Sequence, residues 1–146
     1  MADEQNVPEK PAAPAAPAAA KPAADHVPKA APATGPPDPP PPAGTEVPAF
    51  ITALQAALPD GATQVSYWVG DWTVILPAAH LLAAVSHLAA APGALFDLCS
   101  DLTATDWPPR AERFDVVYCL YSTRLRQRVR LKVKLKVDEA VPTVTG

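Results

Sequence analysis

The stretch "RVRLKVKLKV", residues 128–137, constrains the fold of this chain more than any other segment. It places Arg or Lys at every even position and Val or Leu at every odd position. Successive side chains of a β-strand point to opposite faces, so this alternation predicts a strand with one apolar and one cationic face. The apolar face requires a core, whereas the cationic face suits solvent, a partner protein or a nucleic acid.

The N-terminal part of the chain has a composition that opposes folding. Thirteen of the twenty prolines precede Thr45, and residues 1–45 contain no aromatic residue. Such a segment buries too little apolar surface to offset the entropy lost on ordering. Residues 1–45 are therefore predicted to be a disordered Ala/Pro-rich arm, with polyproline II character around 36–42. Residues 46–146 are predicted to form one domain, which at about 100 residues can hold a modest core.

Within 46–146 the patterns predict two helices and four or five strands. Thr45 is expected to cap a helix over 47–58, and Pro77 is expected to open a second helix that ends near Ala91. The apolar stripe of this second helix is predicted to be Leu81, Leu82, Val85 and Leu88. Strands are expected over 63–69, 72–76, 98–104, 113–122 and 128–137, with Gly70 and Asp71 as the turn of a first hairpin. The fold class is therefore α+β, with two helices packed on a mainly antiparallel four- to five-stranded sheet.

The cationic face of the last strand is the main candidate for a functional surface. Its members are Arg128, Arg130, Lys132, Lys134 and Lys136. A phosphate-tracking surface would use such a row, but any amphipathic strand shows the same alternation. Residues 46–146 carry nine basic against ten acidic residues, and they lack the aromatic and Gly-rich motifs of common RNA-binding modules. Contact with an acidic partner protein, plain solvation and nucleic-acid binding therefore remain as three interpretations.

Other chemistry-bearing residues give weak signals. His80 and His87 lie two turns apart on the second helix, without an evident third metal ligand. Asp97, Asp101 and Asp106 lie beside turns, where Asp serves caps and bends. Cys99 and Cys119 have neither metal-type spacing nor a nucleophile signature, so free thiols packed in or near the core are expected. The residues alone predict no catalytic, metal or cofactor-binding site.

Membrane insertion is also not expected. The start "MADEQNVPEK" has no apolar signal region, which favours a cytoplasmic location. The apolar span from Val74 to Pro92 is interrupted by Pro77 and His80, so it does not fit a transmembrane helix.

Two successive segments carry a family resemblance. The segment "FDLCSDLTATDWP" from Phe96, followed by "RFDVVYCLYSTRLRQRVRLKVKLKVDEAVPTVT" from Arg113, resembles the 30-kDa subunit of respiratory complex I, which is the C subunit of NADH-quinone oxidoreductase. That family shows segments like "FDLLLDLTAVDYP" and "RFEVVYHLLS" in the same order. The resemblance covers roughly residues 47–146 and is most specific from Phe96 to Thr145. The "ERE"-containing family signature would follow Gly146, so the domain is expected to be incomplete at its C-terminus, and no family functional residue is carried over.

The resemblance implies a non-catalytic scaffold subunit in the peripheral arm of a proton-pumping NADH:quinone oxidoreductase. It implies packing chiefly beside the 49-kDa-type quinone-site subunit, on the cytoplasmic side of the inner membrane. NADH, FMN, iron–sulfur clusters and quinone would belong to the parent complex, and none would be bound by this chain. The cationic strand would then face water or a neighbouring subunit. A small nucleic-acid-binding module that uses residues 128–137 is the alternative.

Overall fold

The structure is a computed structural model, which describes residues 35 and 37–144. Its sheet contains β1 (Gln64–Trp68), β2 (Asp71–Ile75), β3 (Leu98–Asp106), β4 (Phe114–Ser122) and β5 (Gln127–Leu135). The strand order is β1-β2-β5-β4-β3, so the amphipathic strand β5 lies at the centre of the sheet. The pairing of β2 with β5 is parallel and the other pairings are antiparallel. The predicted mainly antiparallel sheet is confirmed.

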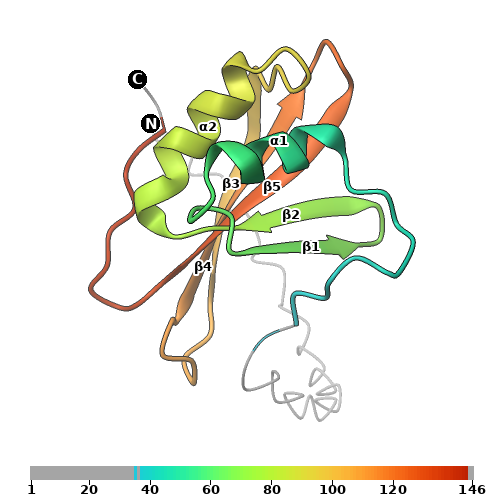
Figure 1. The fold of residues 1–146 in the computed structure, drawn as a ribbon. Coiled ribbons are helices and arrows are strands. Elements are labelled where there is room, and N and C mark those ends of the chain that lie inside the picture. The colour runs from blue at the N-terminus through green and yellow to red at the C-terminus, as the bar shows by residue number, and fades with distance from the viewer. Residues whose placement is uncertain (1–34, 36, 145–146) are drawn as a thin grey trace, which may run out of the picture.

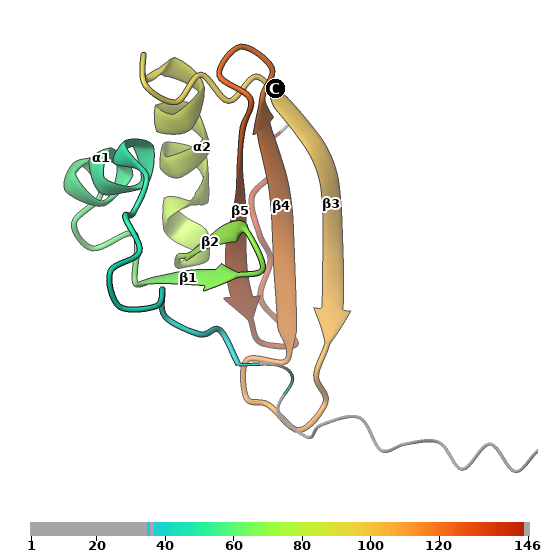
Figure 2. The ribbon, with the colours of Figure 1, turned by 90° about the vertical axis from the view of Figure 1, so that its right-hand side faces the viewer.

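Both helices lie on one side of this sheet. They are α1 (Ala49–Ala57) and α2 (Leu81–Ala90), the latter preceded by the 3₁₀ turn η1 (Ala78–His80). Figure 1 shows α1 and α2 over the sheet, and the rotated view in Figure 2 shows them on the same face of it. The predicted α+β class is therefore confirmed. We call the opposite face of the sheet the second face.

The core lies between the helices and the sheet, and the odd positions of β5 supply its centre. Val129, Leu131, Val133 and Leu135 are all buried. The register places Leu131 beside Val74 of β2 and Tyr118 of β4. From the helices, the core receives Ile51, Leu54, Leu81 and Leu88. Full burial of such a side chain contributes about 1.5–3 kcal/mol to folding, so the odd face of β5 is a large part of the stability.

The ends and faces of the helices differ from the expectation in two details. Thr45 does not cap α1, because the helix begins after Pro48, which makes no side-chain cap, and the Thr45 amide donates to Pro42 in an earlier turn. In α2 the buried stripe includes Ala84, whereas Leu82 is 45% exposed. Residues 81, 84 and 88 share one helical face, and residue 82 points about 100° away from residue 81.

The strand boundaries also correct two expectations. The turn between β1 and β2 consists of Val69 and Gly70, both with positive φ, and Asp71 already belongs to β2 opposite Trp68. Positive φ at both turn positions is the geometry that matches the twist of a two-residue hairpin. Strand β3 is longer than expected and is exposed along its whole length. It is an edge strand beyond the reach of the helices, which explains why its sequence shows no clear apolar period.

The end of the Pro-rich arm contacts the sheet. Residues 1–34 and 36 lie outside the described residues, whereas 37–45 are described and contact the sheet through residues 38 and 39. The Tyr67 amide donates to the Pro39 carbonyl at 3.1 Å, and the Gln64 side-chain amide donates to the Asp38 carbonyl at 2.8 Å. Proline lowers the conformational entropy of the free chain, so polar contacts suffice to order a segment with little apolar surface. The division at residue 45 into arm and domain stays a prediction.

After β5 the chain returns to the core. Val141 and Val144 pack against the buried cluster from the segment that follows the strand. Within 37–144, no helix has both the length and the apolar character needed to cross a membrane.

Candidate interface on the second sheet face

The even positions of β5 point to the second face, as the alternation predicts. We call Arg128, Arg130, Lys132, Lys134 and Lys136 the basic row; the first four lie on β5, whereas Lys136 follows the end of the strand, which stops at Leu135 and not at the expected residue 137. The register places Lys132 between Ile75 of β2 and Val117 of β4, and Lys134 beside Asp115 of β4. Because β5 is the central strand, the middle of this row is flanked by other strands and is only partly exposed.

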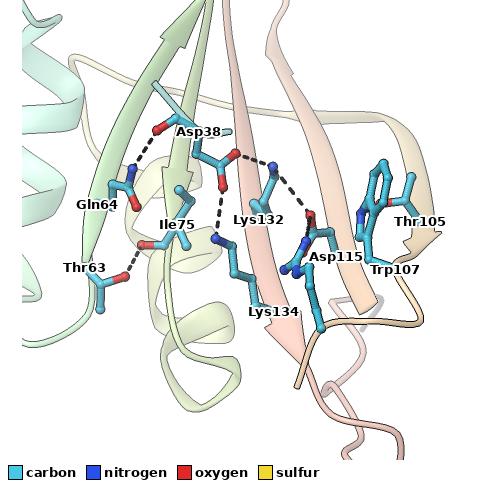
Figure 3. A network of polar contacts seen from close by, with 10 residues as sticks. Asp38, Thr63, Gln64, Ile75, Thr105, Trp107, Asp115, Lys132 and Lys134 are labelled. Carbon is cyan, nitrogen blue, oxygen red and sulfur yellow. Dashed lines mark hydrogen bonds and ion pairs between the residues drawn. The ribbon is translucent and has the colours of Figure 1, made fainter. Parts of the chain in front are cut away.

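Lys132 lies at the centre of a charge network that begins with the arm. Its Nζ atom is 2.5 Å from Oδ1 of Asp38 and 3.8 Å from Oδ2 of Asp115. The Nζ atom of Lys134 is 3.0 Å from the other carboxylate oxygen of Asp38. Figure 3 shows Asp38 reaching both lysines and Lys132 lying between the two carboxylates. One carboxylate from the Pro-rich segment therefore joins two neighbouring cations of β5.

The charge state of Asp38 follows from this position. Burial alone would raise the pKa of Asp38, but the hydrogen bonds and positive charges of Lys132 and Lys134 together outweigh it and hold this pKa below its ordinary value of 3.8. The carboxylate is therefore ionised at neutral pH. Its side chain is 12% exposed and that of Lys132 is 15% exposed, so solvent screens this contact less than it screens a surface ion pair.

Two further carboxylates neutralise the face. Arg110 donates two hydrogen bonds to Asp115, from Nη1 at 3.0 Å and Nη2 at 2.6 Å. The hydrogen bond to Asp115 raises the pKa of Arg110 above its ordinary value, despite partial burial. Arg130 on β5 forms an ion pair with Asp71 on β2, with its Nη2 atom 2.6 Å from Oδ2 of the carboxylate. The central cations of the basic row thus have acidic partners within the chain.

The two ends of the basic row differ from its middle. Lys136 is exposed, and its Nζ atom lies 3.8 Å from Oε1 of Glu139, three residues later in the sequence. Arg128 is exposed, and within residues 37–144 its side chain has neither a carboxylate partner nor a hydrogen bond. It lines a depression of about 360 Å³ on the sheet, together with Asp101, Cys119 and Tyr121.

Sequence reasoning found the basic row but missed its acidic partners. Asp115 could have been found, because pairing the two strands across the turn at 123–126 places it opposite Lys134. Asp38 had no such signal, since it is one acidic residue in a run of prolines distant in sequence from β5.

The weaker candidate residues take structural positions. Asp97 accepts hydrogen bonds from the hydroxyl and backbone amide of Thr123, which lower its pKa. Asp106 pairs with Arg113, whose hydrogen bond lowers the pKa of this exposed carboxyl group. Asp101 lines the depression beside Arg128.

The cysteines and histidines do not come together as a site. Cys99 is exposed on β3, which corrects the expected packing of both thiols in or near the core, and Cys119 is half-buried. An edge strand without a covering layer leaves the Cys99 thiol in solvent. His80 and His87 are both partly buried, and residues 37–144 contain no group of three potential metal-ligating side chains.

Comparison with known proteins places this fold in a family. The family profile described as "Respiratory-chain NADH dehydrogenase, 30 Kd subunit" matches residues 74–146, half of the chain. This match includes the whole of β3, β4 and β5 with the basic row. The chain belongs to this family of respiratory complex I subunits.

Individual relatives of the 30-kDa family agree with the profile. The chain is 42% identical over 77 residues to the C subunit of NADH-quinone oxidoreductase from Paramagnetospirillum magneticum, covering 53% of this chain and 39% of the relative. It is 40% identical over 107 residues to the protein of the same name from a Caulobacter species, covering 69% and 50%. It is 35% identical over 96 residues to a mitochondrial protein of Candida albicans named NADH dehydrogenase [ubiquinone] iron-sulfur protein 3, covering 66% and 34%. The matched part thus spans from a third to half of the length of these relatives.

Proposed function

We propose that this chain is a non-catalytic scaffold subunit in the peripheral arm of a proton-pumping NADH:quinone oxidoreductase. It packs beside the 49-kDa-type, quinone-site subunit on the cytoplasmic side of the membrane. NADH, FMN, iron–sulfur clusters and quinone are bound by other subunits of that complex. The observation that carries this proposal is the family match over residues 74–146, supported by relatives named as subunits of NADH-quinone oxidoreductase.

The charges of the second face suit a structural role better than a nucleic-acid interface. Arg130, Lys132 and Lys134 each contact a carboxylate of the same chain, which reduces the charge available to phosphates. Arg128 and Lys136 remain exposed at the two ends of the row. In the proposed complex these two residues contact the neighbouring subunit, and the middle of the row stabilises the fold.

Co-purification tests this function. The affinity-tagged full chain is co-expressed with the 49-kDa-type subunit of the same organism, and we expect the two to elute together at physiological salt. Arg128→Glu combined with Lys136→Glu should weaken recovery of the partner. Arg124→Glu combined with Arg126→Glu is the matched control, because it makes the same charge change on the exposed β4–β5 turn. A folded chain that elutes as a monomer without this partner would contradict the proposal.

A further inference from the structure

The contact between the Pro-rich segment and β5 has the form of an internal ligand on a binding surface. Pro37, Asp38 and Pro39, which we call the strap, line a hollow of about 250 Å³ together with Ser66, Thr73, Arg130 and Lys132. The strap inserts a single carboxylate between Lys132 and Lys134. Two hydrogen bonds from β1 reach its backbone carbonyls and use no strap side chain.

These contacts define what the surface recognises. The two lysines bind a carboxylate, while Tyr67 and Gln64 bind the carbonyls of an extended backbone. An extended peptide with an acidic side chain provides both groups, whatever its sequence. We propose that the strap is displaceable and covers a docking surface for an extended acidic segment of a partner protein. The contacts that support this are internal to the chain, so the proposal does not depend on the complex I assignment.

The charge pattern of the second face favours a peptide over a nucleic acid. Asp71 and Asp115 lie beside the strap surface, and Asp101 lies further along the same face near Arg128. A nucleic-acid backbone carries a negative charge at each nucleotide and would pass these carboxylates as it followed the basic row. An acidic peptide can place one or two carboxylates at the lysines and neutral residues elsewhere.

The strap also sets the strength of such binding. A partner that needs Lys132 and Lys134 must displace Asp38, so its apparent affinity falls by the fraction of molecules in which the strap is open. Asp38→Asn keeps the size of the side chain and removes its charge, so it should raise the open fraction. The covered surface should then become a stronger binding site without any change in its own residues.

The test uses the full chain and a fluorescent peptide of eleven residues, with aspartate at two alternate central positions and neutral residues elsewhere. This spacing matches the distance of about 6.6 Å between alternate side chains of β5. We expect Asp38→Asn to bind the peptide about tenfold more tightly than the unchanged chain. Adding Lys132→Gln and Lys134→Gln should abolish this gain. Adding Arg124→Gln and Arg126→Gln instead is the matched control and should preserve it, because this pair makes the same charge change on the exposed β4–β5 turn, outside the strap surface.

Hydrogen exchange at the Tyr67 amide gives an independent measure of the strap. This amide donates to Pro39 and should exchange faster in Asp38→Asn than in the unchanged chain. Slow exchange at Tyr67 in the variant, or fast exchange without tighter peptide binding, would overturn the proposal. Tighter binding of a single-stranded oligonucleotide than of the acidic peptide at equal ionic strength would also overturn it, in favour of a nucleic-acid surface.

Discussion

The two faces of the central strand β5 are covered by different kinds of contact, apolar packing on the helix side and ion pairs on the second face. On the helix side, Val129, Leu131 and Val133 are at most 2% exposed and pack in a continuous apolar layer. On the second face, the central cations contact carboxylates from separate parts of the chain, and the Pro-rich strap contacts Lys132 and Lys134. The apolar face is therefore specified by local alternation, whereas the charged face depends on partners up to 94 residues away in sequence.

This difference predicts that the helix side of the sheet contributes most of the folding free energy, whereas the contacts of the second face can change with conditions. Apolar contacts on the helix side are non-directional and shared among many neighbours, so the loss of one large side chain leaves a cavity. The central ion pairs on the second face share their members, because Lys132 contacts both Asp38 and Asp115 and Asp38 also contacts Lys134, so a lost partner is replaced in part by the remaining one. The helix side should therefore tolerate substitution poorly, and the second face should respond to pH, salt and competing ligands.

The largest expected effect tests the contrast directly. Leu131→Ala removes a fully buried side chain at the centre of the sheet and should lower the free energy of unfolding by about 2–5 kcal/mol. Lys132 is the next residue and lies on the opposite face. Lys132→Ala should lower the free energy of unfolding by about 1 kcal/mol or less, because Asp38 still pairs with Lys134 and Asp115 still pairs with Arg110. Urea denaturation of both variants measures the difference. Equal losses would contradict the division of roles between the two faces.

Asp115→Asn should have the next largest effect, because it removes the most buried carboxylate of the second face. The change leaves Arg110 and Lys132, each 15% exposed, without this acceptor and should lower the free energy of unfolding by about 1–3 kcal/mol. Asp106→Asn is the matched control, since the Asp106–Arg113 pair is exposed and its loss should not be measurable. A control loss as large as that of Asp115→Asn in urea titrations would show that burial does not set the strength of these pairs.

The turn between β1 and β2 should give a smaller effect of opposite sign. Val69 adopts a φ of 48°, which is unfavourable for a β-branched residue, and its side chain is 82% exposed. Val69→Asn places the preferred Asn-Gly pair in the turn and should raise the free energy of unfolding by about 1 kcal/mol. Val69→Ile keeps the β-branch and should bring no gain. Thermal unfolding of the two variants distinguishes them, and a gain in both would point to a cause other than backbone strain.

Local patterns in the sequence predict the helix side well. The alternation of β5 and the stripes of the two helices identify the core because each element must bury its apolar face. The hairpin turn was missed by one residue, since Val69 is a poor turn residue and Gly70 could occupy either position of the turn. The length of β3 was underestimated by two residues, because an uncovered edge strand has no buried face and its sequence therefore shows no alternation of apolar and polar residues.

The second face could be predicted only in part. Its cations follow from the alternation of β5, but their partners depend on tertiary structure. Asp71 reaches Arg130 only through the parallel pairing of β2 with β5, which the sequence does not specify. Asp38 reaches Lys132 because the strap crosses the sheet, and an entropy argument based on composition predicted disorder there. Rules based on composition count the burial of apolar surface, so they give no sign of contacts made by one carboxylate and two backbone carbonyls of a Pro-rich segment.

The pH dependence of the strap should be the smallest effect on global stability, because Asp38 holds a surface segment and not the core. The folded-state pKa of Asp38 lies below its ordinary value of 3.8, so its stabilising contribution is present above about pH 4 and is lost as the pH falls through the folded-state value. Opening of the strap should therefore precede unfolding of the sheet on acidification. The Gln64 side-chain amide, which donates to the Asp38 carbonyl, reports it as a change in chemical shift as the pH falls from 7 through the folded-state pKa of Asp38. In Asp38→Asn this shift should already have its open value at pH 7 and stay there. A Gln64 signal that changes only together with the core resonances would mean that the strap and the sheet form one cooperative unit, and the two faces of β5 would then differ in chemistry but not in stability.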